Sequence, residues 1–249
     1  MIRFNALAAG VLVLCATGSA FAQDDAASEP GETASAQADI VSPQSSAAGD
    51  KKFKLGLRLG YAVPSGKVTG PAANDLLQTN GDSLSNGITG QIPIWLDVGY
   101  MVTPNVLLGL YGQYGFASVK DCATGFECSA HDIRFGVQGQ FHILPAESVD
   151  PWLGVGFGYE SLGISTSGQG LSGDGTFKGW EFLNLQGGVD FRATDAITVG
   201  PFLSVSFDQY SSESVSYSNA ALGPNASADI TDKALHEWIT FGAKGTFGI

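Results

Sequence analysis

Residues 53–63 alternate strictly between apolar side chains and small or charged ones. Successive side chains of a β-strand point to opposite faces, so this pattern predicts a strand with one apolar face and one polar face. Its length also matches a tilted β-strand that crosses a bilayer, about 9–11 residues. A chain built largely from such segments must fold as a sheet with two distinct faces.

Seven later segments repeat the pattern. The predicted strands are 53–63, 88–100, 106–116, 131–143, 151–162, 180–192, 197–207 and 238–249. Three short turns alternate with four long polar connections, which are 64–87, 117–130, 163–179 and 211–235. An even number of strands with alternating short and long links is typical of an up-and-down transmembrane β-barrel, with short periplasmic turns and long extracellular loops. We therefore predict an all-β fold, an eight-stranded antiparallel up-and-down transmembrane β-barrel.

The composition agrees with one sizeable β-domain. The chain has 249 residues, of which 44% are hydrophobic and 14% charged, and 34 are glycines. No run of about 18 apolar residues is present, so we predict no transmembrane helix. The formal charge of −12 argues against nucleic acid as a partner, because no basic surface is available to replace the counterions of phosphates.

The N-terminal part has two predicted segments that precede the barrel. Residues 1–22 have the features of a signal peptide: Arg3, an apolar stretch and the cleavage pattern Ala20-Phe21-Ala22. Residues 23–50 are acidic and nearly free of large apolar side chains, so we predict a disordered acidic periplasmic tail. The outer-membrane β-barrel is then expected to span residues 51–249.

Cys122 and Cys128 are the two cysteines outside the predicted signal peptide. An even pair in an exported chain indicates a disulfide. The alternative is a metal site, but two thiolates with only His131 nearby leave zinc short of ligands. We predict the disulfide.

The polar faces of the strands carry charged residues that we predict to lie in the lumen. They are Lys54, Arg58, Asp97, Arg134, Glu160, Asp190, Asp208 and Lys244. An eight-stranded barrel has a lumen just wide enough for side chains to fill, so these charges are expected to pair. By depth, Lys54 and Lys244 are predicted near Asp97 and Asp190, and Arg134 near Glu160 and Asp208. Such a network either plugs the lumen and fixes the register or lines a gated ion path.

Aromatic residues on the apolar faces fall at the two ends of the strands. Phe53, Tyr100, Phe141, Phe191 and Phe247 lie at one end, and Tyr61, Phe116, Tyr159 and Phe207 at the other. Two aromatic girdles on the apolar face are typical of a barrel in a membrane. The alternative, a soluble barrel, would have to pack its apolar face into a narrow lumen.

Over residues 51–249 these features resemble the small eight-stranded outer-membrane barrels of the OmpA/OmpX/opacity type. The last strand, with Phe241, Phe247 and Ile249 in phase, resembles the signal by which the barrel-assembly machinery recognises such proteins. The chain departs from the family in ending with Ile249, where an aromatic residue is usual. The resemblance implies the outer membrane of a Gram-negative bacterium, with outer-membrane lipid, the barrel-assembly machinery and an unknown extracellular ligand as partners.

No catalytic motif stands out. Residues 60–67 resemble a phosphate loop whose spacing is one residue too long, and residues 154–158 lie inside a predicted strand rather than before a helix. His131, His142 and His236 form no recognisable triad. We predict no enzyme activity, no cofactor and no metal site.

The predicted function is a structural or surface-interaction role in the cell envelope, carried by the long extracellular loops. A porin-like protein, with a narrow pore or channel for small solutes, is the first alternative. A barrel-based lipid-modifying enzyme is the second.

Overall fold

The computed structural model describes residues 52–73, 76–79, 81–219 and 222–249; the predicted signal peptide and acidic tail lie outside this part. The long strands are β1 (Phe53–Gly66), β2 (Ile88–Met101), β3 (Val106–Val119), β4 (Glu127–His142), β5 (Val149–Gly168), β6 (Leu171–Arg192), β7 (Ile197–Tyr217) and β9 (His236–Gly248). A short strand, β8 (Ala226–Asp229), and a single helical turn, α1 (Leu84–Gly87), lie in the connections. Within the described residues no helix is long and apolar enough to cross a membrane.

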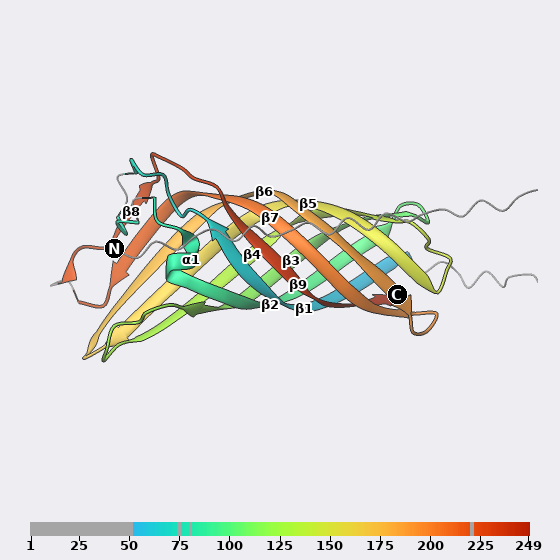
Figure 1. The fold of residues 1–249 in the computed structure, drawn as a ribbon, viewed down its shortest axis with the longest axis horizontal. Coiled ribbons are helices and arrows are strands. Elements are labelled where there is room, and N and C mark those ends of the chain that lie inside the picture. Colours follow the sequence, from blue (N-terminus) through green and yellow to red (C-terminus); the bar gives the residue numbers. More distant parts are fainter. Residues whose placement is uncertain (1–51, 74–75, 80, 220–221) are drawn as a thin grey trace, which may run out of the picture. The chain divides into compact units, whose positions relative to one another are not determined.

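The eight long strands close into one antiparallel barrel. Each pairs with the next along the chain, β6 pairs with β7, and β9 closes the ring by pairing with both β7 and β1. Strand β8 adds to β7 outside this ring. In Figure 1 the strands run obliquely between an end with the short turns and the C-terminus and an end with α1 and β8. The predicted fold class is confirmed.

Several strands extend beyond their predicted ends. The predicted loop 163–179 is mostly strand, because β5 and β6 continue to a two-residue turn at Gln169 and Gly170. Both turn residues have positive φ angles, 53° and 78°, as a type I′ hairpin turn requires. Strand β7 likewise enters the predicted loop 211–235. These extensions are rich in Gly, Ser and Thr with only isolated apolar residues such as Phe177, so regular hydrophobic alternation ends there while backbone pairing continues.

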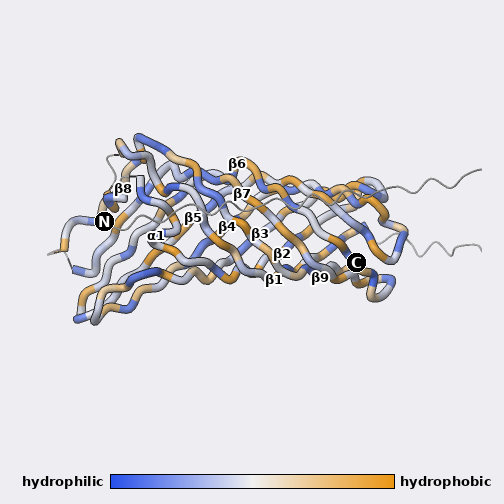
Figure 2. The backbone as a smooth tube through the Cα atoms, in the orientation of Figure 1, coloured by the Kyte–Doolittle hydropathy of each residue, from blue (hydrophilic) through white to orange (hydrophobic). Residues whose placement is uncertain are grey.

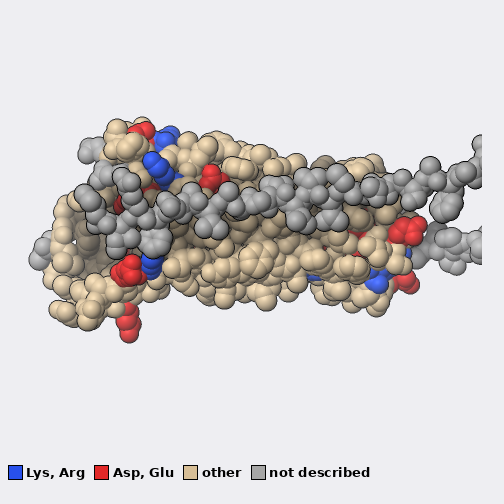
Figure 3. All heavy atoms as spheres, in the orientation of Figure 1, with Lys and Arg blue, Asp and Glu red and all other residues tan. Residues whose placement is uncertain are grey.

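The barrel has an apolar outside and a polar inside. Leu57 is 51% exposed, whereas the next residue, Arg58, is 0% exposed. Along the strands of Figure 2 hydropathy alternates from residue to residue. In Figure 3 the charged residues of the visible face gather toward the two ends of the barrel, and the surface between them is built of other residues. The outward apolar face is what a lipid environment favours.

The aromatic residues predicted for the girdles divide between the two ends of the barrel. Seven of them are exposed: Phe53, Tyr61, Tyr100, Phe116, Phe141, Phe191 and Phe247; Tyr159 and Phe207 are half-buried. Phe53 packs edge-on against Tyr100 at one end, with 5.1 Å between ring centroids. Toward the other end Tyr159 packs against Trp180, a ring that the pattern did not predict, at 5.3 Å. Their place at the membrane surfaces stays a prediction.

The predicted disulfide is confirmed. Cys122 and Cys128 are bonded, with an S–S distance of 2.09 Å, in the connection between β3 and β4. It joins the start of β4 to the preceding loop.

Leu57 lies midway between the aromatic residues Phe53 and Tyr61 of β1, so we expect it at the centre of the bilayer. The substitution Leu57→Arg should lower the free energy of unfolding by about 2–4 kcal/mol, because a charge on the lipid face is most costly at the midplane. Urea unfolding in lipid vesicles measures this loss. Ser167→Arg, on the exposed part of the β5–β6 hairpin, is the control and should change it by less than about 0.5 kcal/mol. Equal losses would contradict the assignment of the lipid-facing band.

Candidate functional site

The lumen holds two buried clusters of charge. The first surrounds Arg58 of β1, whose Nε and Nη2 atoms donate to the two carboxylate oxygens of Asp97 at 2.6 and 3.0 Å. The same guanidinium donates to Gln186 on β6 at 2.7 Å and to Gln138 on β4 at 3.1 Å. The ring of Trp95 lies 4.9 Å from Cζ of Arg58. One cation thus connects four strands through four of its five donors.

Lys244 of β9 extends this first cluster. Its Nζ lies 3.5 Å from Oδ2 of Asp190, as predicted, and donates to Gln140 on β4 at 3.0 Å. Strands β9 and β4 stand opposite each other in the ring. Lys54 lines a cavity of about 10 Å³ together with Asp97 and Lys244, and Arg58 bonds to the same Asp97, a pairing that the sequence did not predict. This cavity has the volume of about one water molecule.

Arg134 of β4 is the centre of the second cluster. Its Nε donates to Asp132 at 2.8 Å and its Nη2 to Glu160 at 3.3 Å, while Nη1 lies 3.9 Å from Glu181 and 4.0 Å from Asp208. The predicted approach of Arg134 to Glu160 and Asp208 is therefore found. All five side chains are at most 1% exposed. One guanidinium thus faces four carboxylates.

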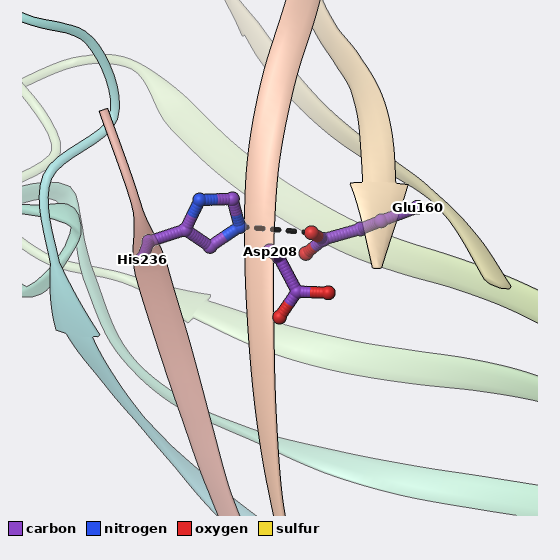
Figure 4. A group of neighbouring side chains, drawn as sticks. All are labelled: Glu160, Asp208 and His236. Atoms are coloured by element: carbon purple, nitrogen blue, oxygen red, sulfur yellow. Dashed lines mark hydrogen bonds and ion pairs between the residues drawn. The ribbon is translucent and has the colours of Figure 1, made fainter. Parts of the chain in front are cut away.

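Glu160 is the most heavily bonded carboxylate of this second cluster. Its Oε1 accepts hydrogen bonds from Arg134, Tyr210 and Trp238, and its Oε2 lies 2.8 Å from Nε2 of His236. Figure 4 shows the His236 ring pointing at Glu160 from β9, with the carboxylate of Asp208 beside them.

Within the described residues Asp208 of β7 accepts one side-chain hydrogen bond, at Oδ2 from Ser206, and its Oδ1 accepts none. One ligand atom each from Glu160, Asp208 and His236 lies within 4.8 Å of the others, and in the described residues no other group of three or more potential ligands meets this condition. These residues are the ones that could hold a metal ion.

Sequence reasoning missed three members of the second cluster: Asp132, Glu181 and His236. Asp132 lies two residues before Arg134 on β4 and therefore points to the same inward face, so the alternation could have identified it. His236 likewise lies two residues before the inward-facing Trp238 on β9 and points to the same face. Glu181 gave no such signal, because a β-bulge turns both Phe182 and Leu183 outward and reverses the alternation there.

A cap of loops covers the second cluster. The connection after β1 crosses to the connection before β9, with Lys67 N donating to Leu235 O at 3.0 Å and Gly70 N to Asp232 O at 2.8 Å. Beneath it lies an apolar core of Ala62, Val68, Ala73, Leu84, Ile88, Ala130, Leu162, Phe177, Tyr210, Ile230 and Trp238. A cavity of about 220 Å³ adjoins this core and is lined by residues such as Leu84, Leu162 and Phe177. Loops and apolar side chains therefore occupy this end of the barrel.

The predicted glycines on the polar face make room for these clusters. A Cβ at Gly56 would lie 2.8 Å from Oδ2 of Asp97. A Cβ at Gly158 would collide with the hydroxyl of Tyr111, which hydrogen-bonds to Glu181. Small residues thus leave space for the large polar side chains of nearby strands.

Arg134→Met should lower the free energy of unfolding by about 3–5 kcal/mol, because it leaves four buried carboxylates without their cation. Urea unfolding in vesicles measures the loss, and the exposed Lys120→Met is the control. Adding Asp208→Asn to Arg134→Met should restore part of the loss, because it removes one unpaired charge. A loss no larger than that of Lys120→Met would contradict the central role of Arg134.

Comparison with known proteins places this geometry in a wider context. The family model for the outer membrane protein beta-barrel domain matches residues 42–227 of this chain. No curated protein matches the chain. Among solved structures, OprG from Pseudomonas aeruginosa is 13% identical, with 81% of this chain and 99% of that chain covered and a TM-score of 0.47. Neisserial surface protein A is 13% identical, with 79% and 97% covered and a TM-score of 0.42. Ail of Yersinia pestis is 14% identical, with 79% and 99% covered and a TM-score of 0.39.

Proposed function

Because the chain belongs to the family of outer membrane protein β-barrel domains, we propose that it is a non-conducting barrel with a structural or surface-interaction role at its extracellular end. Membership of this family implies the outer membrane of a Gram-negative bacterium. The family leaves the role itself open, so the proposal rests on the lumen and on the loops.

The filled lumen is the observation that carries the proposal. Side chains from opposite walls meet at its axis, since Lys244 of β9 bonds to Gln140 of β4 and Arg58 of β1 bonds to Gln186 of β6. Trp95 and Trp152 pack on Arg58 beside these contacts, Trp238 packs on Arg134 in the second cluster, and all three rings are at most 1% exposed. A hydrated ion on this path would have to break several charge-assisted hydrogen bonds at once, which supports a plug over a pore.

The extracellular end offers a surface for contact. The β5–β6 hairpin continues past Trp180 to its turn at Gln169 and Gly170, and β7 continues beside it to Tyr217. Strand β8 and the cap complete this end, which lies at the left of Figure 1. Its paired strands supply a rigid and largely polar platform, which suits recognition of a partner outside the cell.

No catalytic role is part of this proposal. The lipid-modifying alternative needs a serine and a histidine in contact near the rim. In the residues that the structure describes, His236 bonds to Glu160, His142 to Asp150, and Ser206 donates to Asp208. Chemistry on a substrate is therefore not the function that this arrangement supports best.

Planar-bilayer recording tests the plug. The folded chain should give no stepwise ionic current, because Arg58 and Lys244 cross-link the lumen wall. An open porin inserted in the same bilayer is the positive control. Reproducible current steps whose size changes in Lys244→Gln would contradict the proposal and support the porin-like alternative.

Epitope accessibility tests which end faces outward. An epitope inserted between Gln169 and Gly170 should bind antibody on intact cells, because it occupies the tip of the β5–β6 hairpin. The matched epitope after Asn105, in the short turn between β2 and β3, should bind only after the outer membrane is permeabilised. An epitope within residues 23–50 should behave like the second, as a periplasmic tail requires. The reverse pattern would overturn the proposed orientation.

A further inference from the structure

The cluster around Arg134 carries more negative charge than it can balance. Asp132, Glu160, Glu181 and Asp208 lie within 4.0 Å of a single guanidinium, which leaves a formal charge of −3 when His236 is neutral. The other two buried cations, Arg58 and Lys244, are bonded to Asp97 and Asp190 in the first cluster. Uncompensated charge in a dry interior is strongly unfavourable, so this cluster must gain positive charge, either as protons on its carboxylates or as a bound cation.

The same cluster has more hydrogen-bond acceptors than donors. Asp132 Oδ1 and Asp208 Oδ1 are buried and accept no hydrogen bond in the described part of the chain. Gln91 and Gln113 each donate an amide N–H to Asp132, and their own carbonyl oxygens are also buried without a donor. Each such acceptor has lost its hydration without a replacement, which is unfavourable. His236 Nδ1 is likewise buried without a partner in the described part of the chain. An excess of acceptors over donors is the pattern that a bound cation would reduce.

The donor set selects the kind of cation. Glu160, Asp208 and His236 bring two carboxylates and one imidazole together with ligand atoms within 4.8 Å of one another. Calcium prefers a shell of oxygen atoms alone, whereas zinc and its first-row neighbours accept imidazole nitrogen beside carboxylate oxygen. We propose that Glu160, Asp208 and His236 form a buried binding site for a divalent first-row transition metal ion, with zinc as the ion that fits best.

The surroundings of the three ligands suit this role. Arg134, Tyr210 and Trp238 hold Oε1 of Glu160, so its Oε2 faces His236. Binding replaces the hydrogen between Nε2 and Oε2 with the metal ion, and that hydrogen moves to Nδ1, so the imidazole stays neutral. The formal charge of the cluster then rises from −3 to −1. The ion would connect β5, β7 and β9 beneath the apolar cap.

Metal analysis of the refolded chain tests the site. Glu160, Asp208 and His236 are each 0% exposed, so the untagged full chain is folded from urea into detergent micelles with excess zinc and dialysed against metal-free buffer. We expect about one zinc ion per chain, and a thermal unfolding midpoint higher than that of protein folded with a chelator, since an ion that binds only the folded state stabilises it. Calcium in place of zinc should be removed by the same dialysis.

The three histidines of the chain supply matched variants. The double variant H131Q/H142Q keeps only His236 and should retain about one zinc ion, while H236Q keeps the other two and should retain none. His142 is a fair control because it is also buried and bonded to a carboxylate, Asp150, at 2.7 Å. Migration of the unheated protein on a gel checks that each variant folds.

The outcomes separate clearly. Loss of zinc in H131Q/H142Q, or retention in H236Q, would assign the ion elsewhere and overturn the proposal, as would a wild-type chain that binds none. If H236Q does not fold, D208N takes its place and should weaken zinc binding at least about tenfold. Unchanged binding in D208N would also overturn it. None of these results depends on conductance or on a surface partner, so they are independent of the proposed function.

Discussion

Closure of the backbone hydrogen-bond ladder is the constraint on which the rest of this structure depends. In a bilayer a sheet has no water to satisfy its edges, so β9 must pair with β1 as well as with β7. Closing the ring at eight strands fixes a lumen that side chains fill. Every inward residue then has only other inward residues as partners. The pairing of Arg58 with Asp97 and the crowding around Arg134 both follow from this geometry.

The strands could be read from the sequence wherever the two faces of the barrel meet different surroundings. Between lipid and lumen, hydrophobic alternation identifies each strand and its inward residues, and Asp190 was matched with Lys244 on depth alone. Beyond the membrane the regular alternation stops, so the upper halves of β5 and β6 looked like a glycine- and serine-rich loop, although Phe177 there packs in the apolar core. Backbone pairing and the turn at Gly170 maintain those strands without a hydrophobic signal.

The site was less predictable than the fold, because its contacts cross the barrel. The alternation along a strand assigns a residue to the lumen, but it does not say which cation pairs with which acid. Lys54 and Arg58 lie on the same face of β1. The longer, forked guanidinium of Arg58 donates two hydrogen bonds to Asp97. Alternation also failed to identify Glu181 as an inward residue, because the bulge at Phe182 adds a residue to one strand only. A local irregularity thus supplied one of the four carboxylates around Arg134.

The two clusters differ in a way that a structural plug does not explain. In the first, Arg58 bonds to Asp97 and Lys244 to Asp190, so each acid has a cation and the contacts fix the register. In the second, asparagine at position 208 would fill the same space without adding a buried charge. Stability alone therefore favours a more neutral cluster than the one around Arg134. The excess charge lies beneath the cap, at the end where β5, β6 and β7 extend past the barrel. An ion held there would connect β7 and β9, which help to close the ring, to the surface formed by these extended strands.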